Sequence, residues 1–249
     1  MFRLVISDSK RWKNLMNAIA ALIEEATFDI AEDGMKLRAM DPSHVAMVDF
    51  EYAKDAFQIY ECSEPTKLCI NLSDFLKLMK RVTAGESLEL SLSKDKANLE
   101  VKITGKYVKR FSLPLLQPSS SEVPTPKITF DAKIRMDGDS LYDAIRDISS
   151  VSEQVKFEAN PEKLTLSGSG ETGNVVVEFE KDNTSILEFQ VSGEVKALYG
   201  ISYLEDMLKA GSASSKISTI EFSTDKPIKI DFELPEKGKL TYYLAPRIE

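Results

Sequence analysis

The side chains that most often perform catalysis or bind metals are scarce in this sequence. It contains one histidine, His44, and two cysteines, Cys62 and Cys69, which lie close together in the chain. No nucleophile elbow surrounds His44, so a Ser-His-Asp triad has no evident place. Two cysteines without a second pair fit neither a zinc site nor a redox motif. We expect two structural thiols in a reducing environment, no metal, no cofactor and no catalytic residue, and hence a protein that is not an enzyme.

Three glycines form a pattern that is typical of phosphate-binding loops. Gly168, Gly170 and Gly173 spell G-x-G-x-x-G after a strand-like run. A dinucleotide site also needs a helix to follow, because the N-terminus of that helix meets the pyrophosphate. The residues from Val175 to Phe179 are instead β-branched and apolar, which predicts another strand. The glycines therefore indicate a connection between two strands.

A metal-dependent enzyme that uses carboxylates is a second class to weigh. Such a site needs clustered acidic residues. The acids of the first half, such as Asp29, Asp33, Asp41 and Asp49, are dispersed. The sequence therefore favours a binding protein over an enzyme.

Length and charge limit what these residues can belong to. The chain has 249 residues, of which 43% are apolar, and this allows one large domain or two of about 120–130 residues. With 32 basic and 40 acidic residues the net charge is −8, which excludes a binder that is coated in lysine and arginine. No apolar run approaches the roughly 20 residues that span a bilayer, and the N-terminal run is too short for a signal peptide.

Helix and strand patterns of the first half recur in the second half in constant register. Apolar residues at helical spacing predict helices at about residues 10–24 and 74–82, with short alternating strands between and after them. Adding 129 to each position reproduces the pattern, and the matches include Trp12 with Leu141, Phe28 with Phe157, Phe50 with Phe179, Phe75 with Leu204 and Leu78 with Met207. One spacing that holds over both halves indicates two copies of one α+β domain.

A segment rich in proline and serine lies between the two copies. Residues 116–127 include three prolines and three serines, a composition that predicts an extended connector. We expect an N-terminal domain at 1–117, a connector at 118–127 and a C-terminal domain at 128–249.

The charges are distributed unevenly between the halves and over the expected helices. Residues 1–120 hold 17 basic and 17 acidic residues, whereas the remainder holds 15 and 23. On a helical wheel, basic side chains nevertheless lie outside the apolar stripes. They are Lys10, Lys13, Lys77, Lys80 and Arg81 in the first copy and Arg146 and Lys209 in the second, with Asp139, Asp143 and Asp206 beside them. Solvent exposure alone explains each of these charged side chains. Together, however, they suit contacts with the phosphates of DNA, and such contacts do not read the base sequence.

Several segments resemble one protein family over the whole chain. They are residues 25–30 (Glu-Ala-Thr-Phe-Asp-Ile), 38–45 (Arg-Ala-Met-Asp-Pro-Ser-His-Val), 72–80 (Leu-Ser-Asp-Phe-Leu-Lys-Leu-Met-Lys) and 241–248 (Thr-Tyr-Tyr-Leu-Ala-Pro-Arg-Ile). The chain is similar to the proliferating cell nuclear antigen (PCNA) sliding clamps, most of all to the archaeal type. The resemblance implies a pseudo-sixfold ring of three subunits, with helices lining a channel and antiparallel sheets outside. Such a ring encircles duplex DNA as a polymerase processivity factor and as a moving platform for replication and repair enzymes.

The resemblance also implies roles for residues. The DNA channel would be lined by Lys10, Lys13, Lys77, Lys80, Arg81, Arg146 and Lys209. The sequence departs from the family at Asn14, Ala20 and Asp143, where relatives often carry lysine or arginine, so weak contact with DNA is expected.

A partner groove follows from the same resemblance. DNA polymerase, flap endonuclease, DNA ligase and the clamp loader would insert short peptides, of pattern Gln-x-x-hydrophobic-x-x-aromatic-aromatic. The matching positions are Met40, His44, Val45, Val123, Pro124, Pro227, Tyr243, Ala245 and Pro246. Their aliphatic and aromatic surface suits a peptide anchor, although core packing explains Met40 or Val45 alone.

A head-to-tail ring needs two different complementary edges on each subunit. The resemblance places one edge at Lys109, Arg110 and Phe111 and the other on the strand near 174–180. The second set comprises Val175, Val177, Glu178 and Glu180, together with Asp139 and Asp143. Arg81 could form an ion pair with Asp139 or Asp143 of the neighbouring subunit instead of contacting DNA. Opposite charges on paired edge strands would join the sheets.

Three alternatives stay open at this point. The ring can hold three identical subunits, which both edges in one chain favour, or different ones. The chain can also be an acidic protein-interaction module that does not retain DNA. A clamp would be intracellular and bound to the chromosome, in the cytoplasm of an archaeon or the nucleus of a eukaryote.

Overall fold

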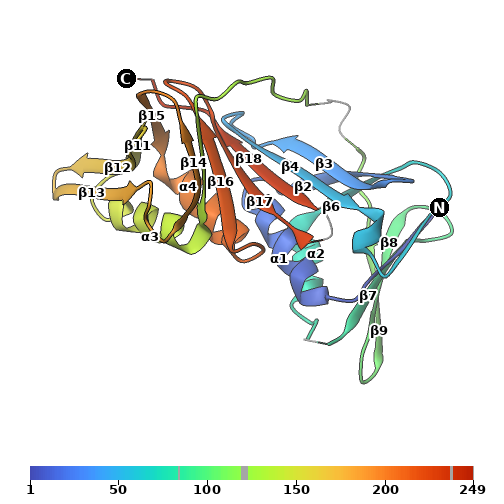
Figure 1. Ribbon diagram of the computed structural model, residues 1–249. Helices are drawn as coiled ribbons and strands as arrows, with labels where there is room; N and C mark the ends of the chain where they lie inside the picture. The colour runs from blue at the N-terminus through green and yellow to red at the C-terminus, as the bar shows by residue number, and fades with distance from the viewer. Residues whose placement is uncertain (84, 119–122, 236–237, 249) are drawn as a thin grey trace. The chain divides into compact units, whose positions relative to one another are not determined.

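The chain divides into two compact units. The structure, a computed structural model, describes residues 1–83, 85–118, 123–235 and 238–248 (Figure 1). The first unit comprises Met1–Pro42, Val48–Val123 and Leu234–Leu240, and the second comprises Ser43–Met47, Pro124–Glu233 and Thr241–Glu249. Two short segments, 43–47 and 234–240, thus group with the opposite half of the chain. Part of the expected connector, residues 119–122, lies outside the described residues.

The first unit contains two helices and two sets of antiparallel strands. One set forms a sheet in the order β5-β1-β7-β8-β9, and in the other the order β4-β3-β2-β6 holds. The helices contact each other. The elements are β1 (Phe2–Ile6), α1 (Ser9–Ala20), β2 (Glu25–Ala31), β3 (Gly34–Met40), β4 (Ala46–Ala53), a 3₁₀ turn (Lys54–Ala56), β5 (Ile59–Cys62), β6 (Thr66–Asn71), α2 (Leu72–Met79), β7 (Ser87–Leu92), β8 (Asn98–Thr104) and β9 (Val108–Pro114).

The second unit repeats this plan. Strands in the order β14-β10-β16-β17 form one antiparallel set, and β13-β12-β11-β15 form a four-stranded sheet. Its two helices also contact each other. The elements are β10 (Ala132–Asp137), α3 (Gly138–Ser149), β11 (Gln154–Asn160), β12 (Lys163–Gly170), β13 (Gly173–Glu180), β14 (Ile186–Val191), β15 (Val195–Gly200), α4 (Ile201–Ser212), β16 (Ile217–Phe222), β17 (Ile228–Glu233) and β18 (Lys239–Leu244), of which Thr241–Leu244 belong to this unit.

The repeat that the sequence predicts is confirmed by the element bounds. Adding 129 to the residue numbers carries α1 onto α3, β2 onto β11 and β6 onto β15 with the same first and last residues. The predicted α+β class, with strands outnumbering helices, is therefore correct for both units.

The helices begin where side-chain caps satisfy free backbone N–H groups. The Asp8 carboxylate accepts from the Arg11 N–H at 2.9 Å, and the Asp137 carboxylate, one repeat later, accepts from the Ser140 N–H at 2.8 Å. The first helix ends at Ala20, one turn before the prediction, because Leu22 and Ile23 are buried in the turn that leads into β2. The stripe of α1 is buried as predicted, whereas Leu78 on α2 is only half-buried.

The three glycines of the phosphate-binding pattern lie in the β12–β13 hairpin. A β-carbon on Gly168 would lie 2.3 Å from the Ile148 side chain, and one on Gly170 would lie 1.9 Å from the carbonyl oxygen of Val151. Both strands contact α3, whose C-terminal turn therefore packs where only glycine fits (Figure 1). The strand interpretation of the motif is confirmed.

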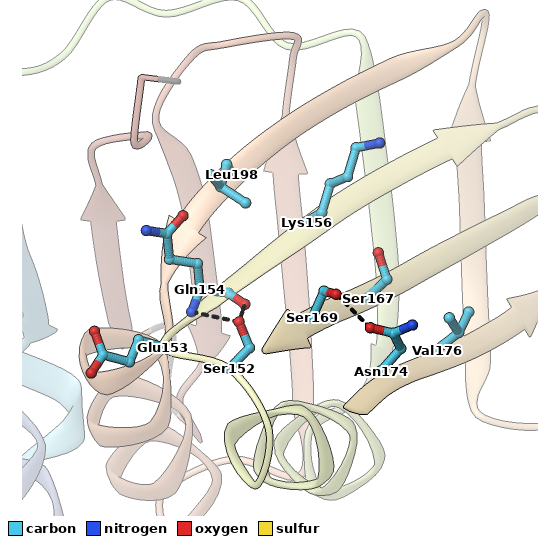
Figure 2. A pocket seen from close by; sticks show the side chains of 10 residues that line it. Ser152, Glu153, Gln154, Lys156, Ser167, Ser169, Asn174, Val176 and Leu198 are labelled. Atoms are coloured by element: carbon cyan, nitrogen blue, oxygen red, sulfur yellow. Dashed lines mark hydrogen bonds between the residues drawn. The ribbon is translucent and has the colours of Figure 1, made fainter. Parts of the chain in front are cut away.

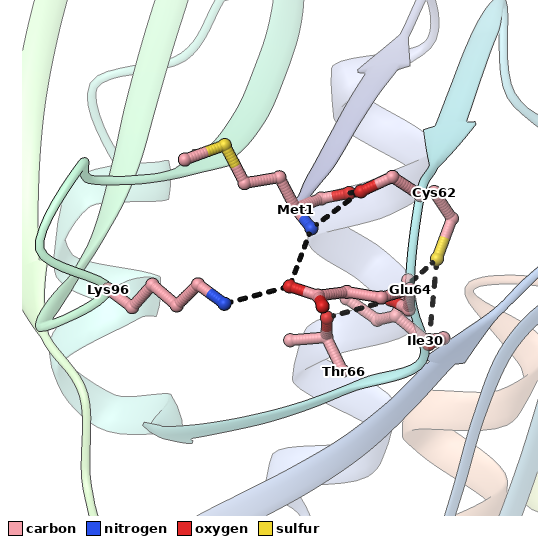
Figure 3. A network of polar contacts seen from close by, with 7 residues as sticks. Met1, Ile30, Cys62, Glu64, Thr66 and Lys96 are labelled. Atoms are coloured by element: carbon pink, nitrogen blue, oxygen red, sulfur yellow. Dashed lines mark hydrogen bonds and ion pairs between the residues drawn. The ribbon is translucent and has the colours of Figure 1, made fainter.

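Both cysteines are free thiols that take part in hydrogen bonds. The Cys62 thiol donates to the carbonyl oxygen of Glu64 at 3.2 Å, and the Glu64 carboxylate pairs with Lys96 and the α-amino group of Met1 (Figure 3). Cys69 is buried and accepts from the Thr27 hydroxyl. Among the described residues, none of the helices has the length and apolar character to cross a membrane, and the same residues hold no cluster of metal ligands.

Candidate functional site

The helices of the first unit present a basic face to solvent. Trp12, Leu15 and Phe75 bury one side of the pair, and the opposite side carries the five predicted DNA-facing cations. Lys10, Lys77, Lys80 and Arg81 are exposed and Lys13 is half-exposed. Lys77 pairs with Asp74 at 2.7 Å, whereas the other four make no ion pair with any described residue. Asn14 and Ala20, the two departures on α1, are half-exposed on the same helix.

The helices of the second unit present a face of mixed charge. Arg146 and Lys209 are exposed, as the sequence predicts. Arg146 pairs with Asp143 at 3.1 Å, so its charge is partly compensated within α3. Asp206 lies one turn before Lys209, and partial burial raises the pKa of this carboxyl. Each helix pair could therefore contact a polyanion, but the first is far better suited to it.

Each unit has an edge strand where the sequence predicts a subunit contact. β9 pairs only with β8 in the five-stranded sheet, and β13 pairs only with β12 in the four-stranded sheet, as far as the described residues go. Phe111, Val175 and Val177 are half-buried on one face of these strands. An edge strand carries unpaired N–H and C=O groups that can pair with another chain. The geometry thus provides two different free edges in one chain.

The charged residues at these edges differ in how free they are. Arg110 and Glu180 are exposed and make no ion pair with a described residue. Glu178 pairs with Lys163 across the hairpin, and Asp139 pairs with Lys216 at 2.7 Å. Only the first two are therefore fully available to another subunit.

Lys109 forms an ion pair and a hydrogen bond within its own unit, which the sequence pattern did not indicate. Its ammonium donates to the Arg81 carbonyl oxygen at 2.9 Å and pairs with Glu86 at 2.8 Å. The two side chains are only 17% and 11% exposed. The pair ties β9 to the turn after α2, and it lowers the pKa of Glu86 below its ordinary value of 4.5.

Lys109→Met should destabilise the first unit in a pH-dependent manner. A carboxyl group whose pKa is lowered by folding stabilises fully above its unfolded pKa, and this stabilisation is lost as the pH falls through the folded value. The difference in urea midpoint between wild type and variant should therefore be largest at pH 7 and shrink below about pH 4. Glu86→Gln should show the same loss at pH 7. A difference that stays constant from pH 7 to pH 3 would contradict this assignment.

The predicted groove residues of the second unit occur in segments that hydrogen bonding brings together. The Ala245 N–H donates to the carbonyl oxygen of Val45 at 2.8 Å, so the C-terminal segment runs beside residues 43–47. Val45 is 38% exposed, an unusual degree for valine, and His44 has a positive φ of 57°. Tyr243, Pro246 and Pro227 are half-exposed, and Pro124 is exposed. Met40 and Val123, which are half-exposed, belong to the first unit.

The four-stranded sheet of the second unit also has a hollow of about 620 Å³ that the sequence did not indicate (Figure 2). Serine and amide side chains line it together with Glu153, Lys156, Val176 and Leu198, and Ser169 and Asn174 bond across the β12–β13 hairpin. The hollow brings together neither a pair of catalytic groups nor a set of metal ligands.

Known proteins match the chain over its whole length. The family model described as "Proliferating cell nuclear antigen, N-terminal domain" matches residues 1–114, and the one described as its C-terminal domain matches residues 124–247. The DNA polymerase sliding clamp of Thermococcus gammatolerans is 36% identical over 248 residues, covering 100% of this chain and 99% of the relative.

Solved structures of sliding clamps also match the chain over nearly its whole length. The PCNA from Thermococcus kodakaraensis superposes with a TM-score of 0.94 at 26% identity, covering 99% of this chain and 100% of that chain. The protein in the structure titled "C-terminal region of FEN-1 bound to A. fulgidus PCNA" gives 0.90 at 29% identity, covering 100% and 99%. Two repeated domains with these helices and sheets define the DNA-clamp class of proteins. The chain belongs to the proliferating cell nuclear antigen family.

Proposed function

We propose that the chain is a DNA sliding clamp, a ring around duplex DNA that serves as a polymerase processivity factor and a platform for replication and repair enzymes. The basic helix face of the first unit is the observation that carries this proposal. It concentrates lysines in a protein of net charge −8, and the relatives that match the chain end to end are DNA polymerase sliding clamps. The protein acts by binding and not as an enzyme.

In this proposal the DNA channel is lined by the helices of both units. Lys10, Lys13, Lys80 and Arg81 supply the main phosphate contacts, with weaker ones from Lys77, Arg146 and Lys209. Such contacts hold the duplex without reading its sequence. We keep residues 1–117 and 128–249 as the two clamp domains and 118–127 as their connector.

The ring closes when β9 of one subunit pairs with β13 of the next. Phe111 would then meet Val175 and Val177, and Arg110 would lie near Glu178 or Glu180. Asp139 and Asp143 at this contact are an alternative partner for Arg81, in place of DNA. Because both edges occur in one chain, we propose a homotrimer, and native mass spectrometry of the lone protein tests this against a requirement for different subunits.

Partner proteins bind, in this proposal, through short peptides at Val45, Tyr243, Ala245 and Pro246, with Met40, His44, Val123, Pro124 and Pro227 as further contacts. The neighbouring solved structure, in which the C-terminal region of FEN-1 is bound to a clamp, supports a peptide-binding mode. Candidate partners are DNA polymerase, flap endonuclease, DNA ligase and the clamp loader, at chromosomal DNA in the archaeal cytoplasm.

Val45→Glu should weaken peptide binding at least tenfold, because it places a charge where an apolar anchor docks. The measurement is the fluorescence anisotropy of a labelled Gln-x-x-hydrophobic-x-x-aromatic-aromatic peptide. Leu187→Glu is the matched control, since Leu187 is 53% exposed on β14 of the same unit, outside the groove. Equal affinities for both variants and wild type would rule out the groove at Val45.

Primer extension tests the function as a whole. With a polymerase and clamp loader from a related archaeon, the protein should lengthen the products made in one binding event on a primed circular template. Products of unchanged length, in a reaction where the related organism's own clamp lengthens them, would contradict the proposal.

A further inference from the structure

The two helix pairs of this chain carry opposite charge on their exposed faces. In the first unit, α1, α2 and the turn after α2 hold six basic residues and one acidic residue. In the second unit, α3, α4 and the segment after α4 hold three basic residues, one of which is Lys216, and five acidic residues. The acidic set comprises Asp139, Asp143, Asp147, Glu205 and Asp206.

The acidic residues of α3 share the stripe that points away from the core. Leu141, Ala144, Ile145 and Ile148 are buried, and the exposed positions Asp139, Asp143, Arg146 and Asp147 recur at helical spacing on the other side. On α4 the exposed stripe includes Ser202, Asp206 and Lys209. One repeat earlier, Asp139, Asp206 and Lys209 correspond to Lys10, Lys77 and Lys80, whereas Asp147 corresponds to the buried Ala18.

Ion pairs neutralise part of the charge on the helix face of the second unit. Arg146 pairs with Asp143 at 3.1 Å, and Lys216, which follows α4, pairs with Asp139 at 2.7 Å. Asp147 has no cationic partner among the described residues, so its charge is uncompensated. In the first unit the reverse holds, because Lys10, Lys13, Lys80 and Arg81 lack acidic partners in the part of the chain that the structure describes. The exposed field is therefore positive over α1 and α2 and negative over α3 and α4.

We propose that DNA inside the ring is held mainly by the first units, and that Asp147 and Asp206 on the helix faces of the second units oppose the weaker contacts of Arg146 and Lys209. This inference rests on the proposed clamp function. Phosphates within about 10 Å of Asp147 and Asp206 lie inside one Debye length at moderate salt, so the repulsion is felt. The duplex then meets three attractive surfaces and three of mixed charge around the ring. Asp147 and Asp206 act as residues that keep binding shallow.

Asp147→Asn combined with Asp206→Asn tests the proposal. Removing two charges from each of three subunits should raise the affinity of the ring for a duplex of about 30 base pairs roughly three- to tenfold at about 50 mM salt. The gain should vanish at about 500 mM salt, where charges are screened. Asp147→Asn alone, at an exposed position, should raise the affinity by a smaller factor.

Two comparisons make the result specific. Asp182→Asn with Glu194→Gln changes the net charge equally, but both residues are exposed in turns between strands of the same unit, and affinity should change less than twofold. Lys13→Gln with Lys80→Gln should lower affinity and flatten its salt dependence. If the helix variant binds like wild type, or if the turn variant gains as much, the proposal is wrong.

The outcome separates this inference from the clamp function. Retention of the wild-type ring on closed circular DNA reports encirclement and does not depend on the acidic faces. A retained ring whose helix variant shows no gain would overturn the repulsion alone. A wild-type protein that circles do not retain would overturn the function and the inference with it.

Discussion

Phe111→Glu and Val177→Glu should each convert the ring into monomers, and an equimolar mixture of the two variants should form dimers but no trimers. Each substitution places a charge on the half-buried face of an edge strand, β9 in one case and β13 in the other. Burying an unpaired carboxylate costs several kcal/mol. Each interface should therefore weaken by more than about a hundredfold, which breaks a ring of three such contacts.

The mixture tests the head-to-tail arrangement directly. The Phe111→Glu subunit keeps an intact β13, and the Val177→Glu subunit keeps an intact β9, so one good contact can form between them. Analytical ultracentrifugation should show monomers for each variant alone and a one-to-one dimer for the mixture. Phe111→Leu, which preserves an apolar side chain, should remain trimeric. Trimers from either glutamate variant would show that these edges do not join the subunits.

Gly170→Ala should destabilise the second unit by about 2–4 kcal/mol, the cost of forcing two backbone segments apart. The new β-carbon would lie 1.9 Å from the carbonyl oxygen of Val151, which is backbone and cannot swing aside. Either β12 or the C-terminal turn of α3 must move. The expected result is a lower urea midpoint, measured at one protein concentration because assembly also contributes to stability.

Gly193→Ala is the matched control. No atom lies within 4 Å of the β-carbon that it would add, so its stability should stay within about 0.5 kcal/mol of wild type or rise slightly. If the two variants prove equally stable, the glycines of the β12–β13 hairpin are not packing residues, and the motif needs another explanation.

The repeat was the part of the fold that sequence reasoning could predict best. Periodic apolar residues report burial directly, so one constant spacing relates α1 to α3 without any tertiary information. The C-terminal end of α1 was harder to predict. Leu22 and Ile23 continue the apolar character of the helix, but they are buried in a turn, and a pattern of burial does not distinguish these cases.

The ion pairs and hydrogen bonds of individual side chains could not be predicted from the sequence pattern. Lys109 and Arg110 are adjacent cations of one strand, yet alternation points one toward Glu86 and leaves the other exposed. Glu86 is 23 residues from Lys109 in the chain, and only the fold brings them together. The hydrogen bond between Ala245 and Val45 likewise joins segments from opposite ends of the chain, whose relation came from family resemblance and not from periodicity.

Retention on circular DNA before and after linearisation tests the central claim most directly. The protein is loaded onto a nicked plasmid, free protein is removed by gel filtration at high salt, and the complex is then cut once with a restriction enzyme. A topologically linked ring should stay with the uncut circle and be lost from the linear product, because only ends allow it to slide off. Equal retention on both forms, or none on the circle, would contradict encirclement.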